Sequence, residues 1–72
     1  MNEKHFTQQI TLEEMQTEVK REIATRKRVY PRWIENGKIK KETADFRVLV
    51  LEALQIFLQD ELKKSAPQRN LI

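Results

Sequence analysis

The 72-residue chain contains no cysteine, one glycine, two prolines and one histidine. Without cysteine it can form neither a disulfide nor a thiolate metal site. So little glycine and proline does not suit a turn-rich β fold, whereas 35% charged residues are typical of helices. The length allows one domain, so the sequence predicts a single all-α domain.

Long apolar runs and the common signatures of enzymes are also missing. The longest apolar run is Val48-Leu49-Val50-Leu51, whereas a membrane-spanning helix needs about 20 apolar residues. The amino-terminal residues do not have the pattern of a targeting signal, so we expect a cytoplasmic protein. His5 has no second histidine or cysteine to act with, and no glycine-rich phosphate loop is present. We therefore expect a non-enzymatic protein that needs no metal or other cofactor.

The first helix is expected over residues 12–36. Thr11 and Glu14 have the pattern of a capping box, in which each side chain accepts from the backbone amide of the other residue. Apolar residues recur at helical spacing downstream, and Gly37 can supply a left-handed carboxyl-terminal cap. Pro31 lies within this span and leaves two alternatives, one kinked helix or two shorter helices. The helical spacing of the aromatic residues across the proline favours the kink.

The second helix is expected over residues 41–64. Residues 46–51 are β-branched and apolar enough for a strand, but the length of the segment and the Leu, Ala, Glu and Gln residues that follow favour a helix. A connection of about four residues between helices of similar length predicts an antiparallel helical hairpin. Residues that face each other across it should have numbers that sum to about 77. A DNA-binding helix-turn-helix is a weaker alternative, because its helices cross at about 90–120°.

Helix 41–64 is apolar around most of its circumference, apart from a narrow polar stripe. One partner helix cannot bury so wide an arc, and such a helix is normally buried. We therefore expect two hairpins to dimerise into a four-helix bundle. We expect residues 1–10 to be a flexible arm and residues 65–72 to be a flexible tail. The residues expected in the core or in the oligomer interface are Val19, Ile23, Tyr30, Trp33, Ile34, Leu51, Leu54, Phe57 and Leu58.

Two arginines lie among these apolar positions. Arg26 interrupts the apolar stripe of the first helix and can pair with Glu22, four residues earlier. Across a dimer seam this pair would fix the register of the two chains, a role that buried polar groups can play. Arg47 is expected near Tyr30 in the hairpin, over whose ring it could form a cation–π pair.

Positive charge is concentrated in the middle of the chain. Residues 20–41 carry nine cations and two acids, a net charge of +7, whereas residues 1–19 carry −3 and residues 42–72 carry −1. A cationic cluster binds phosphates by releasing counterions, although a cation-rich face can also serve only to keep an apolar protein soluble. The candidate contacts for a nucleic acid or an acidic protein surface are Lys27, Arg28, Arg32, Lys38, Lys40 and Lys41.

A second kind of charge cluster is acidic. Glutamates near the start of the first helix and acids near the end of the second would meet at one end of the hairpin. Such a group could in principle hold a hard cation, which prefers oxygen ligands. Solvated charge at helix ends explains the same residues equally well.

Residues from about 18 to 55 contain the segments Arg21-Glu22-Ile23, Arg26, Val29-Tyr30-Pro31, Trp33-Ile34, Gly37-Lys38, Glu42, Ala44-Asp45 and Leu51-Glu52-Ala53. These segments resemble a family of small phage and prophage proteins. In that family an Arg-Glu-Ile segment leads to a Val-Tyr-Pro-x-Trp-Val/Ile core, a Gly-Lys/Arg turn and a second helix with a Glu-Ala pair. The resemblance implies a short helical protein of phage or prophage origin and no established biochemical activity. This chain departs from the pattern at Lys40, where Thr or Ser would cap the second helix.

Two functional hypotheses follow from these features. The first is a homo-oligomeric phage accessory protein that binds DNA, RNA or an acidic protein surface through the basic loop end of the hairpin. The second is a structural, assembly or anti-defence module that docks on a larger phage or host protein through the apolar second helix.

Overall fold

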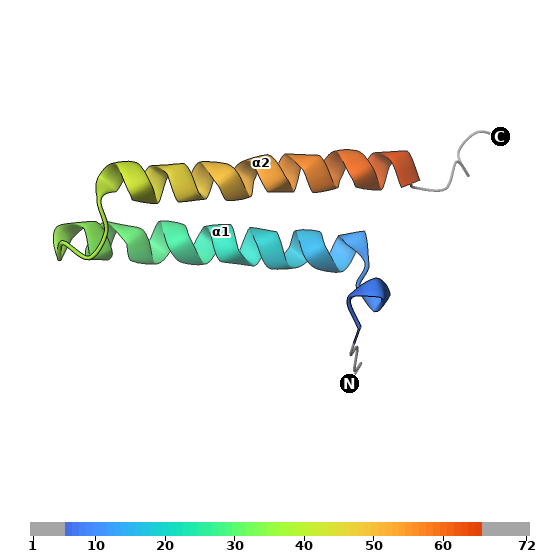
Figure 1. Cartoon of the computed structure of the whole chain (residues 1–72), viewed down its shortest axis with the longest axis horizontal. Coiled ribbons are helices and arrows are strands. Elements are labelled where there is room, and N and C mark those ends of the chain that lie inside the picture. Colours follow the sequence, from blue (N-terminus) through green and yellow to red (C-terminus); the bar gives the residue numbers. More distant parts are fainter. Residues whose placement is uncertain (1–5, 66–72) are drawn as a thin grey trace.

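The chain folds into a hairpin of two helices (Figure 1). The computed structural model describes residues 6–65, in which α1 spans Leu12–Glu35 and α2 spans Lys41–Ser65. The helices lie side by side and antiparallel, so the start of α1 and the end of α2 share one end of the molecule, called the open end below. The predicted all-α helical hairpin is confirmed, and each predicted helix boundary lies within one residue of the structure.

The structure describes only part of the two ends that were predicted to be flexible. Residues 1–5, which include His5, and residues 66–72 lie outside the described residues. Within the predicted arm, a 3-10 turn spans Thr7–Gln9. The Gln9 amide donates to the Phe6 carbonyl at 2.9 Å and closes this turn. The flexibility of both ends stays a prediction.

The predicted capping box begins α1. The Glu14 amide donates to Thr11 Oγ1 at 3.1 Å, and the Thr11 amide donates to the Glu14 carboxylate at 2.8 Å. The first amides of a helix have no partner within the helix, so each of these bonds satisfies a group that would otherwise need water. The cap therefore sets the first residue of α1 at Leu12.

α1 continues without a break through Pro31. Proline has no amide hydrogen, so the Lys27 carbonyl loses its helical donor. Both Lys27 and Pro31 are exposed, which allows water to bond to this carbonyl. Tyr30, directly before the proline, is buried and holds this turn against α2. Of the two alternatives for this segment, the division into two shorter helices is wrong.

The connection between the helices turns at Gly37, the one described residue with a positive φ, at +75°. The Lys38 amide donates to the Trp33 carbonyl at 2.8 Å, and the Gly37 amide donates to the Ile34 carbonyl at 3.1 Å. This pair of bonds is a Schellman motif, which satisfies the last carbonyls of α1. Lys40 then precedes α2, so the helix starts where predicted without Thr or Ser at this position.

Replacing Gly37 with alanine is expected to lower the free energy of unfolding by about 1 kcal/mol. A Cβ at this position meets no atom within 4 Å, so the cost comes from the left-handed backbone alone. Urea unfolding followed by circular dichroism measures the change. Asn36→Ala is the control, because Asn36 has an ordinary φ of −84°. An equal loss in the two variants would contradict this account of the turn.

α2 is a single helix, so residues 46–51 do not form the strand considered as an alternative. Its first turn contains an ion pair of helical spacing between Lys41 Nζ and Asp45 Oδ2, at 2.8 Å. Its last turn carries Lys63 and Lys64, which lie near the negative end of the helix dipole. Glu42 in the first turn and the two lysines in the last turn therefore complement the helix dipole, while the centre of the helix is apolar.

The two helices meet along a seam in which residues are spaced alternately by four and by three. This heptad spacing keeps one stripe of each helix facing the other. The interhelical ion pair of Lys27 and Glu52, at 3.1 Å, joins residues whose numbers sum to 79, close to the predicted 77. The seam consists of Leu12, Gln16, Val19, Ile23, Arg26 and Tyr30 in α1 and of Ala44, Val48, Leu51, Gln55, Leu58 and Leu62 in α2.

The core of the single hairpin is small. Among the described residues, the buried side chains are Ile23, Tyr30, Ala44 and Leu58, with exposures of 2–8%. Ten large hydrophobic side chains in the same part of the chain are exposed. One hairpin therefore leaves most of its apolar surface in water.

The structure divides the set predicted for core or interface. Ile23, Tyr30 and Leu58 are buried in the seam, and Val19, Ile34 and Leu51 are half-buried at its edges. Trp33, Leu54 and Phe57 are exposed by 40%, 41% and 56%, respectively, because they lie outside the seam. These last three are not core residues of the hairpin, and their place in an oligomer interface stays a prediction.

Candidate binding surfaces

The six cations predicted to bind an anionic partner fall into two groups. Lys27 Nζ lies 3.1 Å from Glu52 Oε2, and Lys41 Nζ lies 2.8 Å from Asp45 Oδ2. The hydrogen bond to Asp45, and then the attraction of its charge, raise the pKa of Lys41. These two cations support the hairpin itself, and their charge is balanced locally.

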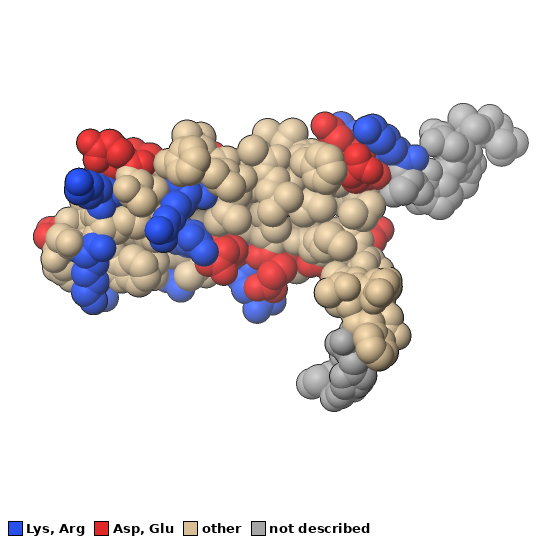
Figure 2. Space-filling view, viewed as in Figure 1, with Lys and Arg blue, Asp and Glu red and all other residues tan. Residues whose placement is uncertain are grey.

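The other four cations form the loop-end patch, which consists of Arg28, Arg32, Lys38 and Lys40. All four are exposed, and none forms an ion pair within residues 6–65. Arg28 and Arg32 are one helical turn apart on α1, and both line a hollow of about 160 Å³ next to Trp33. Lys38 and Lys40 follow in the connection. Figure 2 shows lysine and arginine gathered toward this end of the molecule.

Free cations of this kind can bind phosphates. Each exposed ammonium or guanidinium group keeps its donors available, and arginine matches the geometry of a phosphate with two donors at once. Because the four charges are unpaired, no existing ion pair has to break when an anion binds. The loop-end patch is therefore the part of the predicted cationic cluster that remains suited to an external partner.

A polar cluster around Arg26 occupies the middle of α1. Arg26 Nε donates to Glu22 Oε1 at 2.8 Å, and Arg26 Nη1 donates to the Tyr30 hydroxyl at 2.8 Å. The bond to Glu22 first, and then the bond to Tyr30, raise the pKa of the guanidinium. The Tyr30 and Trp33 rings lie 5.8 Å apart at 49° and extend the cluster toward the loop. Arg26 is thus held in one orientation while still partly exposed.

The cation over the Tyr30 ring is Arg26, with its guanidinium carbon 5.9 Å from the ring centre. Arg47, which from the sequence could have taken this place, lines a hollow together with Arg26 and Tyr30. The prediction was wrong because Arg26 is four residues before Tyr30 on the same helix and reaches the ring without crossing to another helix. The spacing of Glu22, Arg26 and Tyr30 could have indicated this cluster.

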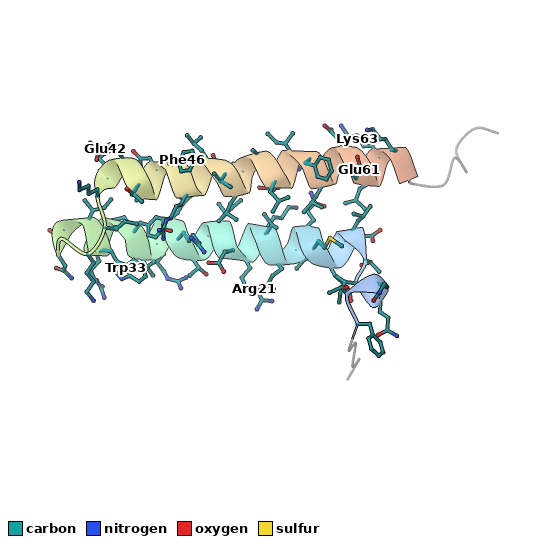
Figure 3. All side chains as sticks on the ribbon, viewed as in Figure 1. Arg21, Trp33, Glu42, Phe46, Glu61 and Lys63 are labelled. Carbon is teal, nitrogen blue, oxygen red and sulfur yellow. The ribbon has the colours of Figure 1, made fainter. Side chains whose placement is uncertain are left out.

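One side of the hairpin, called the groove face here, is hollowed along the line where the helices meet. A groove of about 670 Å³ at the open end is lined by Met15, Val19, Leu54 and Leu58, with glutamates on its rim. A hollow of about 380 Å³ near the loop is lined by the Arg26 cluster and by Arg47. Figure 3 shows Trp33 in the loop half of the hairpin and Glu61 near the open end.

The groove face consists of two stripes of side chains, one on each helix, which can be identified from helical spacing. Residues three and four positions apart project from the same side of a helix, so the lining residues can be extended along each helix. The α1 stripe consists of Met15, Val19, Glu22, Arg26, Val29 and Trp33, and the α2 stripe consists of Arg47, Val50, Leu54, Phe57 and Glu61. Within these stripes, Met15, Trp33, Val50, Leu54 and Phe57 are apolar and exposed.

A second apolar surface, the outer face of α2, turns away from α1. Its members Phe46, Leu49 and Ile56 are 65%, 60% and 59% exposed, respectively. In Figure 2 the middle of α2 carries residues without charge. Contiguous apolar surface of this kind marks an interaction site more often than a chance exposure does.

The structure also bears on two further points from the sequence, the hard-cation site and the lack of a membrane-spanning helix. Within the described residues, no three acidic or histidine side chains gather closely enough to hold a metal ion, so the hard-cation site at the open end is not formed. No helix in residues 6–65 combines the length and apolarity that crossing a membrane requires.

Comparison with known proteins gives no further assignment. No protein-family model, curated protein or solved structure matches this chain.

Proposed function

We propose that this protein is a non-enzymatic nucleic-acid-binding protein that dimerises into a four-helix bundle and contacts its partner through the loop-end patch. The observation that carries the proposal is the set of four exposed cations at one end of the hairpin that form no ion pair within residues 6–65. A phosphate backbone suits such a set, because its binding releases condensed counterions.

The dimer is proposed on the apolar surface that one hairpin leaves exposed. Trp33, Leu54 and Phe57 are each at least 40% exposed, and they lie on faces that the seam cannot cover. Burying apolar surface gains about 25 cal/mol per Å², so a second hairpin on these faces would stabilise both. A chain of 72 residues is short for an independent core, and oligomerisation is a usual remedy.

Removing the loop-end patch is expected to weaken nucleic-acid binding at least about 100-fold at low salt. The variant is Arg28→Gln, Arg32→Gln, Lys38→Gln and Lys40→Gln together. Fluorescence anisotropy with mixed-sequence duplex and single-stranded DNA and RNA, at several salt concentrations, measures the affinity. The salt slope on a duplex should fall by up to about 0.9 for each lost phosphate contact.

The matched control removes the same number of charges elsewhere, at Lys20, Arg21, Lys63 and Lys64, which are exposed and lie outside the patch. This control should keep most of the affinity and of the salt slope. Equal weakening in the two variants would contradict a role for the patch. A wild-type protein that binds no nucleic acid at low salt would remove nucleic acid as the partner and leave an acidic protein surface.

The second candidate function is a structural, assembly or anti-defence module that docks on a phage or host protein. The observation that favours it is the exposure of Phe46, Leu49 and Ile56 on the outer face of α2. Persistent binding of an apolar dye to the purified oligomer, lost in Leu49→Lys, supports this candidate. The phage or prophage origin and the cytoplasmic location remain predictions, and the origin depends on the sequence resemblance alone.

A further inference from the structure

The α1 stripe of the groove face is self-complementary when it is read in reverse. Residues at equal distances from its midpoint have numbers that sum to 48, and they match in chemistry. Met15 corresponds to Trp33, Val19 corresponds to Val29, and Glu22 corresponds to Arg26. Two copies of α1 laid antiparallel on this stripe would therefore place apolar residues on apolar residues and an acid on a base.

The α2 stripe has the same property. Its paired residues have numbers that sum to 108, so Arg47 pairs with Glu61 of the second copy and Leu54 pairs with Leu54 of the second copy. Val50 and Phe57, both apolar, have numbers that sum to 107, so each lies close to the other of the second copy. The two ends of this stripe are oppositely charged, so reversing one copy brings unlike charges together.

The midpoints of the two stripes lie at the same level of the hairpin. The α1 stripe is centred on residue 24 and the α2 stripe on Leu54, and these numbers sum to 78. Residues at the same level of the two helices have similar sums. The numbers of Lys27 and Glu52, which form the interhelical ion pair, sum to 79, and those of Val19 and Leu58, which line one groove, sum to 77. A single two-fold axis across the groove face can therefore pass through both midpoints.

We propose that the groove face binds the groove face of a second copy of this chain, antiparallel, with α1 against α1 and α2 against α2. This inference rests on the dimer of the proposed function and not on the nucleic-acid contact. A two-fold dimer is isologous, so each contact occurs twice. Two Glu22–Arg26 pairs then meet at the axis and form a ring of four alternating charges.

The charge pattern selects the antiparallel dimer over the parallel one. In a parallel two-fold dimer each α1 faces the α2 of the partner, at equal levels of the hairpin. Glu22 and Arg26 would then lie near Phe57 and Leu54 but would keep each other as partners within one chain. Arg47 would instead face the stretch between Val29 and Trp33, so its charge would be desolvated against apolar side chains. Burying a charge without a counter-charge costs far more than burying it in a pair. The antiparallel arrangement avoids this cost at every charged position of the stripes.

The size of the face fits a stable dimer. Two helices, each about 36 Å long and about 10 Å wide, present a face of about 700 Å². Standard stable interfaces bury about 800 Å² on each partner. The exposed Trp33 ring would lie over Met15 of the second copy, at the groove of the open end. Arg28 and Arg32 project from another side of α1, so the loop-end patches stay accessible at opposite ends of the bundle.

A single cysteine at position 54 tests the arrangement directly. The chain has no cysteine, so Leu54→Cys introduces one thiol per copy. In the antiparallel dimer the two residues meet at the axis, where Cα atoms within about 7 Å allow a disulfide. We expect rapid and nearly complete oxidation to a covalent dimer. Leu49→Cys is the matched control, because Leu49 is more exposed but lies on the outer face of α2, and it should cross-link slowly.

The outcomes separate this inference from the proposed function. A dimeric mass with no disulfide in Leu54→Cys would overturn the antiparallel arrangement and leave the dimer standing. A monomeric mass would overturn both the arrangement and the dimer. Loss of nucleic-acid binding alone would affect neither, since the loop-end patch is not part of the groove face.

A charge exchange gives an independent test that needs no cysteine. Arg47→Glu places an acid opposite Glu61 of the second copy, and Glu61→Arg places two bases together. Each single variant is expected to raise the dimer dissociation constant about 10-fold, and the double variant is expected to restore most of it. Additive weakening in the double variant, measured by sedimentation equilibrium, would overturn the proposed pairing of these two residues.

Discussion

Leu58→Ala is expected to lower the free energy of unfolding by about 2–5 kcal/mol. Leu58 is 4% exposed and is one of four buried side chains among the described residues. Truncating a buried leucine loses its transfer free energy and leaves a cavity that the seam cannot fill. A domain of this length has a total stability of about 4–11 kcal/mol, so the loss is a large share of the whole.

Urea and thermal unfolding followed by circular dichroism at a fixed protein concentration measure this loss. Leu49→Ala is the matched control, because it makes the same change on the same helix at a site that is 60% exposed. We expect the control to change stability by no more than about 0.5 kcal/mol. Similar losses at the two sites would mean that the seam between α1 and α2 is not where the hairpin is held together.

Leu54→Lys is expected to dissociate the dimer and to raise its dissociation constant by about 100-fold or more. Leu54 is 41% exposed in the single hairpin and lies at the proposed axis, so one substitution places two lysines against each other. The loss combines buried apolar surface from both copies with the cost of bringing two like charges out of water. Because Leu54 faces its own copy across the axis, the two new charges meet there directly, and no other single position on the groove face should have a larger effect.

Sedimentation equilibrium over a range of concentrations measures this change. Leu49→Lys adds the same charge to the outer face of α2, and it should leave the dissociation constant within a few-fold of the wild-type value. If Leu49→Lys dissociated the dimer and Leu54→Lys did not, the dimer would use the outer face instead. The pair of variants therefore distinguishes the two apolar surfaces of α2.

The local signals in the sequence were sufficient for the fold. Thr11 and Glu14 fixed the start of α1, and Gly37 fixed its end, because capping depends on residues within one turn of each other. The expectation that facing residues have numbers that sum to about 77 predicted the seam, and this register was correct to within two residues. Pro31 was harder to place, because a proline weakens a helix without deciding whether packing on both sides can hold it together.

Which of the candidate residues belong to a binding surface could be decided only from the tertiary structure. Six cations looked alike in the sequence, yet only the structure distinguishes Lys27 and Lys41, which have acidic partners, from the four that do not. The wide apolar arc of α2 indicated an oligomer but not which side of the helix would be used. The side of the helix could be chosen only once the groove was known, because the groove forms only where two helices lie side by side.

The solution mass of the wild-type chain tests the central claim most directly. The central claim is that one hairpin is incomplete and that a second copy covers its groove face. Light scattering coupled to size-exclusion chromatography should give twice the chain mass of 8.7 kDa at micromolar concentrations. A cooperative, stable species of 8.7 kDa over the same range would contradict the account, because the exposed apolar stripes would then need no partner.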